Sequence, residues 1–330
     1  MIVITGATGH LGNVLVRKLL NCNIKVRVLV LPGEDVSSLE GLEVEKIEGN
    51  VCAPDSLRRV FKGADTVYHC AGIISILPGQ QKELFQVNVT GTQNVVNVCL
   101  EEKVKRLVYI SSIHALSEPE KGIVIDESRR FDPENVLGEY SRSKALGTLE
   151  VIKGIERGLD AVILCPSGII GPYDYHMSEM GKLIVDFFKG KVKAYVGGAY
   201  DFVDVRDVAE GLIFACNQGK KGECYILSGH HISVNKILKY LERLSGKKAP
   251  EIKLPYWVAR AFGAINVLYC SLINTRPLFT PFSIDVLASN SLISYHKAET
   301  NFGYSPRSVY ESLKDAVDWF KEKGIIKLIK

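Results

Sequence analysis

The sequence has no strong excess of either charge. Its 330 residues include 41 Lys and Arg against 37 Asp and Glu, a formal net charge of +4, and the basic residues are scattered along the chain. Domains that bind nucleic acids carry clustered basic residues, so we expect no nucleic-acid partner. There is also no internal repeat, no low-complexity tract and no linker that cuts the chain cleanly. A chain of this length has room for one large or two smaller domains with a substantial core.

The eight cysteines lack the spacing of a metal site or a disulfide framework. They form no C-x-x-C pair and no Cys/His cluster, and several lie in apolar runs, such as Cys70 in VYHC and Cys165 in AVILCP. Buried, reduced thiols of this kind are typical of cytosolic proteins, so we expect a cytoplasmic protein without a bound metal. The apolar run at 2–4 directly follows Met1, so no secretory signal peptide is expected.

Long hydrophobic runs are scarce, and one segment stands out. WVARAFGAINVLYCSLI, at 257–273, has 17 residues and is interrupted by Arg260. That length is short for a membrane span, and a helical arginine inside a bilayer is costly. We expect a buried or pocket-lining helix here, with docking at a membrane surface through 257–273 as the alternative.

Glycine, in contrast, recurs at every third position in TGATGHLG, residues 5–12. An apolar run precedes this stretch, and a segment with apolar residues at helical spacing follows it, so the order is strand, glycine turn and helix. In that setting Gly6 allows the tight turn, Gly9 lets the backbone approach a pyrophosphate, and Gly12 lets the helix pack close to the sheet. The start of the helix favours an anion, so the predicted ligand is a dinucleotide. A flexible loop is the alternative, because the spacing differs from G-x-G-x-x-G.

Strand and helix patterns alternate over the first half of the chain. The expected strands are 25–30, 42–49, 65–70, 106–112 and 160–166, and the helical patterns between them are 55–61, about 81–102 and 140–157. This alternation predicts an α/β fold of the Rossmann type, a doubly wound parallel sheet with helices on both faces. Ligands of such sheets bind beyond the carboxyl ends of the strands, where TGATG, CAG and SSIHA follow three of them.

Beyond Pro166 the pattern loosens. GPYDYHM at 171–177 and VGGAYDF at 196–202 have the composition of loops, whereas 203–218 is helical and 222–227 is a strand. We therefore expect a dinucleotide-binding domain over 1–170 and a smaller, mainly substrate-binding lobe over 171–330. Elements near 202–229 are expected to return to the first domain.

The stretch YSRSK, residues 140–144, places Tyr140 and Lys144 on the same face of a helix. An ammonium beside a phenol favours the phenolate and lowers the pKa of the tyrosine. Tyr140 can then exchange a proton with a carbonyl or alcohol oxygen near neutral pH. An exposed Tyr/Lys pair without chemistry is the alternative.

Ser112 strengthens the catalytic interpretation, because it ends a predicted strand 28 residues before Tyr140. Its hydroxyl can donate to the same substrate oxygen. Ser111 points to the opposite face if the strand continues, so only one of the two serines serves. His114 shares the face of Ser112 by strand alternation, and it either lines the substrate pocket or is structural.

The sequence resembles an extended short-chain dehydrogenase/reductase, the group that includes sugar-nucleotide epimerases and dihydroflavonol reductases. The matching stretches span about residues 2–211 in family order; they are TGATGHLG, GNVCAPDSL, VYHCAG, NVTGTQNV, YISS, YSRSK, PSGIIGP and FVDVRDVAEG. The resemblance implies a catalytic triad of Ser112, Tyr140 and Lys144, with Lys144 also holding the nicotinamide ribose. Relatives commonly dimerise through two long helices, here near 81–102 and 140–157, so a homodimer is expected.

The resemblance also implies the positions of the cofactor contacts. Asn50 and Val51 are expected at the adenine, and Ala71 and Gly72 beneath the adenine-side ribose; the family commonly has Asp in place of Asn50. The whole expected set is Gly6, Thr8, Gly9, His10, Leu11, Gly12, Asn50, Val51, Ala71, Gly72, Tyr140, Lys144 and Pro166.

Two departures from the nucleotide-sugar branch bear on the substrate. Cys165 and Gly168 replace the charged and amide residues of an R-x-x-N pattern, and Ala199 and Tyr200 stand where a cation meets the sugar-nucleotide phosphate. A pocket without these anchors suits an uncharged, more apolar substrate. The chain is thus most similar to the dihydroflavonol-reductase-like branch, with relatives among the 3β-hydroxysteroid dehydrogenases. Tyr200 is expected in the substrate pocket, with His114.

The choice of cofactor depends on the end of the second strand, VRVLVLPGED. An acid there holds the ribose 2′-hydroxyl of NAD, whereas a nearby arginine accommodates the 2′-phosphate of NADP. Leu31 occupies the family's frequent arginine position, Glu34 and Asp35 come a little late, and Arg27 is within reach in sequence. These features favour NADP(H) over NAD(H).

Three classes of function are consistent with these residues. The first is NAD(P)(H)-dependent reduction of a carbonyl, or oxidation of the alcohol, on an apolar, ring-bearing small molecule. The second is a sugar or nucleotide-sugar epimerase or dehydratase that retains its NAD. The third is a dinucleotide-sensing binding protein, which typically lacks the tyrosine or lysine that this chain has at Tyr140 and Lys144. We favour the first.

Overall fold

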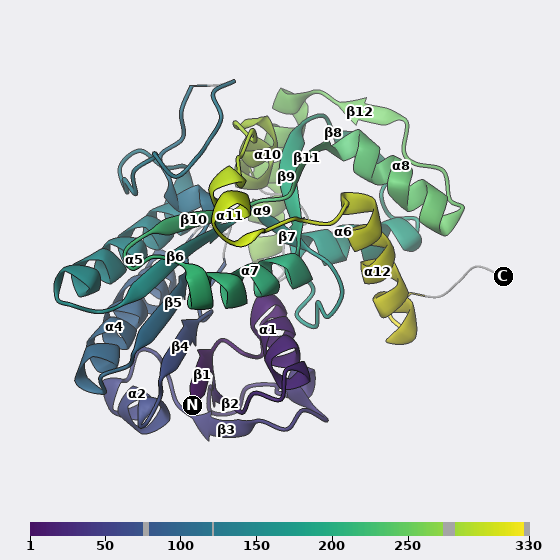
Figure 1. The fold of residues 1–330 in the computed structure, drawn as a ribbon. Helices are drawn as coiled ribbons and strands as arrows, with labels where there is room; N and C mark the ends of the chain where they lie inside the picture. Colours follow the sequence, from purple (N-terminus) through teal and green to yellow (C-terminus); the bar gives the residue numbers. More distant parts are fainter. Residues whose placement is uncertain (75–78, 121, 273–280, 327–330) are drawn as a thin grey trace.

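A seven-stranded parallel sheet lies at the centre of the computed structural model, which describes residues 1–74, 79–120, 122–272 and 281–326 (Figure 1). The strand order is β10-β6-β5-β4-β1-β2-β3, and every neighbouring pair is parallel. The strands are β1 (Ile2–Thr5), β2 (Val26–Val30), β3 (Glu45–Glu48), β4 (Thr66–His69), β5 (Arg106–Ile110), β6 (Ala161–Pro166) and β10 (Cys224–Leu227). The predicted Rossmann-type fold is confirmed.

Helices cover both faces of this sheet, so its inner strands are apolar nearly throughout. One face packs against α1 (His10–Asn21) and α7 (Val205–Gln218); the other packs against α2 (Pro54–Phe61), α4 (Thr92–Glu101) and α5 (Gly138–Glu156). The strand order reverses between β1 and β4. A crevice opens beyond the carboxyl ends of strands at such a reversal, and the turns after β1, β4 and β5 meet there.

The helix expected at about 81–102 is interrupted. The structure has α3 (Gln81–Phe85), a π-helical segment η2 (Gln86–Gly91) and then α4. The wider turn buries Asn88, and a close approach at Gly147 accommodates it, because a Cβ on Gly147 would lie 2.2 Å from the Asn88 carbonyl oxygen. Regular apolar spacing hides such a bulge, which is a common feature of functional sites.

The strand expected at 106–112 is shorter in the structure. β5 ends at Ile110, and a 3₁₀ turn, η3 (Ile113–Ala115), follows the two serines. The turn begins where the Ser112 hydroxyl accepts a hydrogen bond from the His114 backbone N–H, at 3.2 Å. Ser112 therefore starts a turn rather than continuing the strand.

The rest of the chain forms a second layer beside the sheet. A three-stranded sheet, β11-β9-β7, combines β7 (Gly168–Ile170), β9 (Ala199–Asp204) and β11 (His230–Ser233), and β8 (Ala194–Val196) pairs with β12 (Ile252–Leu254). The helices of this layer are α6 (Glu179–Phe188), α8 (Val234–Ser245), α9 (Tyr256–Leu272), α10 (Pro281–Ala288) and α12 (Val309–Glu322), whereas α11 (His296–Phe302) packs on α7 and β10 in the core of the main sheet. Most of this layer shares one apolar core.

Two expectations for this half of the chain need comment. The stretch 196–202 is not all loop, because β9 begins at Ala199 and is buried from Tyr200 onward. The glycines at 197 and 198 give the stretch the composition of a loop. β10 completes the seven-stranded sheet, whereas β9 belongs to the three-stranded one. The domain boundary near 170 stays a prediction, as does a homodimer through α3, α4 and α5.

α9 differs from the buried or pocket-lining helix that was expected over 257–273, of which residue 273 lies outside the described part. Trp257 and Phe262 are exposed, while Ala259 and Gly263 face inward against the neighbouring helix α10. Within the described ranges, no helix has the length and apolar character needed to cross a membrane.

Candidate active site

The glycine turn after β1 forms one wall of the crevice, and its three glycines are under different constraints. Gly6 has φ of +70°, and a Cβ there would lie 2.6 Å from the backbone nitrogen of Ala71. A Cβ on Gly12 would lie 2.0 Å from the Gly6 carbonyl oxygen. A Cβ on Gly9 would meet only the Gly6 carbonyl oxygen, at 3.4 Å, and Gly9 has an ordinary φ of −68°. Packing of the chain therefore requires Gly6 and Gly12 but leaves Gly9 open to a phosphate.

Side chains at the start of α1 tie this turn to the segment after β7. His10 Nε2 lies 2.9 Å from the Pro172 carbonyl oxygen. The buried Asn13 side chain donates to the carbonyl oxygens of Gly9 at 3.0 Å and Tyr173 at 3.2 Å. Leu11 packs against the core. These contacts fix the turn from behind and leave the backbone N–H groups at the helix start for an anion.

A carboxylate lies at the carboxyl end of β2. Glu34 Oε1 accepts a hydrogen bond from the Thr8 hydroxyl at 2.6 Å, and Oε2 accepts one from the Leu31 backbone N–H at 2.9 Å. The turn that carries Glu34, closed by its own N–H to the Leu31 carbonyl at 3.1 Å, folds the acid back toward the strand. Glu34 is thus not too late in the chain to reach the glycine turn.

Arg27, in contrast, lies at the other end of β2. Its guanidinium donates to Glu45 at 2.9 Å and to the backbone carbonyls of Val60 and Lys62. Those contacts hold its positive charge away from the crevice, so Arg27 does not reach a 2′-phosphate.

The remaining residues expected at the cofactor follow β3 and β4 or end β6, at the carboxyl edge of the sheet. Asn50 Oδ1 accepts from the Cys52 N–H at 2.8 Å, and the Val51 carbonyl accepts from Asn94 at 3.1 Å. The backbone N–H of Ala71 donates to the Thr5 hydroxyl at 3.2 Å. Pro166 is buried at the end of β6.

Gly72 connects the cofactor side of the crevice to the catalytic side. A Cβ on Gly72 would lie 3.2 Å from Asn88 Oδ1 and 3.8 Å from the Lys144 ammonium. The backbone at Gly72 therefore passes directly beside the catalytic helix.

Lys144 is buried on α5, and its ammonium donates to the Ile110 carbonyl oxygen at 2.6 Å and lies 5.1 Å from the centre of the Tyr109 ring. Burial lowers the pKa of Lys144 to about 8. The pKa of Tyr140 is raised by burial, and the Ser112 hydroxyl acts in the opposite direction. Lys144 was expected to lower that pKa, but its ammonium is directed to Ile110, so burial is the largest cause in this structure.

The structure separates the two serines after β5. The Ser111 hydroxyl is buried and lies 2.7 Å from the hydroxyl of Thr148 on α5. Ser112 lies on the side of Tyr140, whose pKa it influences. Ser112 thus lies beside Tyr140, and the Lys144 ammonium lies at the Ile110 carbonyl, two residues before Ser112. The triad and its catalytic roles stay a prediction.

Sequence reasoning missed two polar residues that organise this centre. Asn88 donates to the Ile73 carbonyl and to the Ser143 hydroxyl, both at 2.9 Å, and accepts from the Ile73 N–H at 2.8 Å. His69 bridges the Thr5 and Thr92 hydroxyls at 2.8 and 3.1 Å. Asn88 lies in the NVTGTQNV stretch, which is the one signal in the sequence that marks it.

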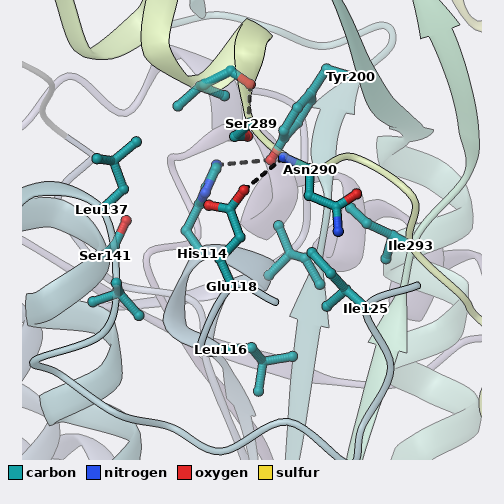
Figure 2. Close-up of a pocket in the computed structure, with 13 residues that line it drawn as sticks. His114, Leu116, Glu118, Ile125, Leu137, Ser141, Tyr200, Ser289, Asn290 and Ile293 are labelled. Atoms are coloured by element: carbon teal, nitrogen blue, oxygen red, sulfur yellow. Dashed lines mark hydrogen bonds between the residues drawn. The ribbon is translucent and has the colours of Figure 1, made fainter. Parts of the chain in front are cut away.

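A hollow lined by His114, Ser141 and Tyr200 lies between the main sheet and the second layer (Figure 2). Its empty space is about 430 Å³, open solvent included. The apolar lining consists of Ile113, Leu116, Ile125, Val136, Leu137, Val286 and Ile293, and the polar lining consists of His114, Glu118, Ser141, Tyr200, Ser289 and Asn290. Neither Lys nor Arg is among these residues.

His114 and Tyr200 both line this hollow and point toward each other (Figure 2). Their role as substrate-pocket residues stays a prediction. His114 Nε2 lies 2.8 Å from the Tyr200 hydroxyl, the two rings stack with centroids 5.7 Å apart, and the Tyr140 ring is 6.4 Å from His114. Burial lowers the pKa of His114 to about 4, so the imidazole is neutral near pH 7.

One polar atom of the lining has no protein partner. The Ser141 hydroxyl is buried and has no hydrogen-bond partner among the residues that the structure describes. Ser141 follows Tyr140 directly on α5. The Glu118 carboxylate, in contrast, accepts a hydrogen bond from the backbone N–H of Asn290 at 2.6 Å. An unsatisfied buried hydroxyl is unfavourable unless a ligand supplies its partner.

Comparison with known proteins agrees with this geometry. Residues 2–228 match the model of the NAD dependent epimerase/dehydratase family. The chain is 36% identical to sterol demethylase protein B of Methylococcus capsulatus, over 98% of this chain and 99% of that protein. It is 30% identical to a putative dihydroflavonol 4-reductase of Synechocystis, over 98% and 95% of the two chains. The crystal structure of gox2253 superimposes with a TM-score of 0.87 at 31% identity, over 99% of both chains.

The unequal constraints on the glycines yield a paired test. Gly9→Val is expected to weaken dinucleotide binding by about a hundredfold or more while leaving the melting temperature within about 2 °C, because the side chain fills only the space for the pyrophosphate. Gly12→Val is expected to destabilise the fold itself, by about 3 kcal/mol, because its Cβ overlaps the Gly6 carbonyl. Fluorescence titration with NADH and thermal unfolding measure the two effects. Unchanged affinity in a folded Gly9→Val protein would assign Gly9 to the turn alone.

Proposed function

We propose that this chain, which belongs to the NAD dependent epimerase/dehydratase family and is an NAD(P)-dependent oxidoreductase, acts on a hydroxyl or ketone of an apolar, ring-bearing substrate of the sterol class. One observation carries this proposal: the residues that line the hollow include seven apolar side chains but no lysine or arginine. A nucleotide sugar presents a diphosphate, which gains little in a site without charge-assisted partners.

The residues of the triad divide the work at the reacting oxygen. The nicotinamide, when bound, supplies or accepts the hydride. In the direction of oxidation, Tyr140 takes the proton of the substrate hydroxyl on its phenol oxygen; in reduction, it returns that proton. The Ser112 hydroxyl donates to the same oxygen as negative charge develops there. Lys144 would hold the nicotinamide ribose when the cofactor is bound, and its positive charge, one helical turn from Tyr140, would favour the phenolate over the phenol.

The hollow favours the ring system of such a substrate in two ways. A planar ring system that buries on the order of 200 Å² gains roughly 5 kcal/mol before the costs of ordering. The neutral His114–Tyr200 pair adds aromatic surface beside Tyr140 without adding charge. The unpartnered Ser141 hydroxyl offers one hydrogen bond to a polar group on an otherwise apolar molecule.

The name of the relative from Methylococcus capsulatus, sterol demethylase protein B, supports the sterol class. That relative matches this chain over nearly the full length of both proteins, including the second layer that lines the hollow. The dihydroflavonol reductase relative supports the same type of substrate, a fused ring with an oxygen function.

Glu34 favours NAD(H) as the cofactor, the reverse of the preference drawn from the sequence. Its carboxylate lies at the end of β2 beside Thr8, whereas Arg27 is held at the far end of the strand. A carboxylate in that place accepts a hydrogen bond from a ribose 2′-hydroxyl and repels a 2′-phosphate.

The charge of Lys144 predicts a pH dependence. Burial lowers the pKa of Lys144 to about 8, so the ammonium is present below that pH and is lost as the pH rises through it. We expect kcat/KM for ketone reduction to fall above pH about 8, because both the proton on Tyr140 and the charge beside it are needed. The pH profile is measured in buffers of constant ionic strength. In Lys144→Met we expect a low residual rate whose kcat/KM no longer falls near pH 8. A wild-type profile that stays flat to pH 10, about two units above that pKa, contradicts this role.

Cofactor preference is tested at Glu34. We expect wild-type kcat/KM to be higher with NADH than with NADPH, and Glu34→Gln to reduce that ratio by about tenfold, because the amide keeps an acceptor but loses the charge. Asp35→Asn is the matched control, since the Asp35 carboxylate accepts hydrogen bonds from the N–H and the hydroxyl of Ser37 within its own turn. A wild-type preference for NADPH would overturn the assignment.

The substrate class is tested by comparing two kinds of molecule. With NAD⁺ present, a 3β-hydroxysterol is expected to produce stoichiometric NADH, and Tyr140→Phe is expected to abolish that turnover while changing dinucleotide affinity by no more than about threefold. UDP-glucose is expected neither to turn over nor to compete.

The epimerase alternative gives the opposite pattern. Interconversion of a UDP-sugar without net change in nicotinamide absorbance, with NAD retained through purification and no reaction of sterols, would replace the proposed function.

A further inference from the structure

The first half of α9 exposes an apolar surface that the fold leaves uncovered. Trp257 is 74% exposed and Phe262 62% exposed, and Ile252, on the adjoining strand β12, is 62% exposed. Tyr256 and Ala261 are exposed between them. These five residues define the α9 face. Surface residues of this size usually occur singly, so three large exposed groups within eleven positions mark an interaction surface.

The polar groups within this surface are already satisfied by the protein. Arg260 is the only charged residue in the 17 residues of α9, and its guanidinium donates to Asp285 of α10 at 3.1 Å. The Tyr256 hydroxyl donates to the same carboxylate. With this charge paired, the first half of α9 presents the side chains of Trp257, Ala261 and Phe262 outward.

Lysines border the α9 face. Between 247 and 262 there are four basic residues and one acid, Glu251. Lys248 and Lys253 are exposed, and so are Lys191 and Lys193, which lead into β8, the strand paired with β12. Aromatic residues with lysines around them are typical of helices that lie in the interface of a bilayer, and lysine attracts anionic headgroups. Interfaces between protein chains are depleted in lysine, so this composition favours a membrane over a second copy of the chain.

We propose that the α9 face docks this protein on the surface of an anionic lipid bilayer, with Trp257 and Phe262 inserted at the headgroup level and the lysines at the lipid phosphates. The chain lies on the membrane rather than across it, in keeping with the lack of a membrane-spanning helix in the described residues.

The position of α9 gives this docking a consequence for substrate access. α9 packs on α10, and α10 contributes Phe282, whose ring lies 6.4 Å from that of His114, and Val286 at the wall of the hollow. Resting on the proposed function, an apolar ring substrate dissolved in the bilayer thus enters beside α10 with little passage through water. The docking itself requires no substrate, so it is measured separately from activity.

The two tryptophans make docking directly observable. Trp319 is 6% exposed, whereas Trp257 is 74% exposed, so a change in emission on adding vesicles reports Trp257. With the full chain we expect a blue shift with vesicles of phosphatidylcholine and phosphatidylserine, quenching by lipids brominated near the headgroup, and co-sedimentation that weakens with salt. Vesicles of phosphatidylcholine alone are expected to bind about tenfold more weakly.

Variants distinguish this face from other apolar positions. Trp257→Ser with Phe262→Ser is expected to reduce co-sedimentation by about tenfold or more, and Lys253→Glu to reduce only the dependence on phosphatidylserine. Phe85→Ser, which removes an exposed phenylalanine from α3, is the control and is expected to bind like wild type. Unchanged emission and no co-sedimentation of the folded wild type would overturn the proposal. A wild-type protein that binds no vesicles but self-associates, with self-association lost in the double variant, would also overturn it, because the face would then join two copies of the chain. Turnover of a detergent-solubilised sterol by the double variant separates a failure of docking from a failure of the proposed activity.

Discussion

A buried ammonium organises the centre of this molecule. Removing the Lys144 charge from water is costly, and the structure compensates with the Ile110 carbonyl at 2.6 Å and the face of the Tyr109 ring. Both partners belong to β5, so the ammonium fixes α5 against the end of that strand. Burial, together with the same charge, lowers the pKa of His69 to about 3 and keeps that imidazole neutral between Thr5 and Thr92.

The neighbouring features follow from the position of that lysine. Gly72 lies close to Asn88 and Lys144, so a side chain there would press on the Asn88 amide, and Asn88, in the π-helical turn, donates to the Ile73 carbonyl. Gly147 lets the α5 backbone approach the Asn88 carbonyl. The catalytic helix, the cofactor crevice and the π-helical turn are therefore one packed unit, in which a change at one member displaces the others.

Charge is distributed unevenly along the crevice, and this pattern links the site to the proposed chemistry. A carboxylate, Glu34, lies beside the glycine turn, an ammonium lies at the end of β5, and the hollow has a neutral His114–Tyr200 pair among aliphatic side chains. Such an arrangement suits a dinucleotide with free ribose hydroxyls and a substrate without phosphate. The apolar character continues outward from the hollow through α10 to the exposed side chains of α9.

The sequence by itself determined the fold class, the glycine turn and the pairing of Tyr140 with Lys144, because these depend on contacts within a few residues or on periodicity along one element. It also distinguished Ser112 from Ser111, since alternation is a local property. Tertiary structure alone decided the rest. Glu34 reaches Thr8 through a turn, Arg27 is held by β3 and by the end of α2, and Asn88 is bonded across 55 positions to Ser143. β9 follows two glycines that give its start the composition of a loop, and Trp257 and Phe262 in the first half of α9 are exposed although the composition of the helix predicts burial. Each of these depends on which distant backbone lies within hydrogen-bonding or packing distance, and the order of residues along one segment does not specify that distance.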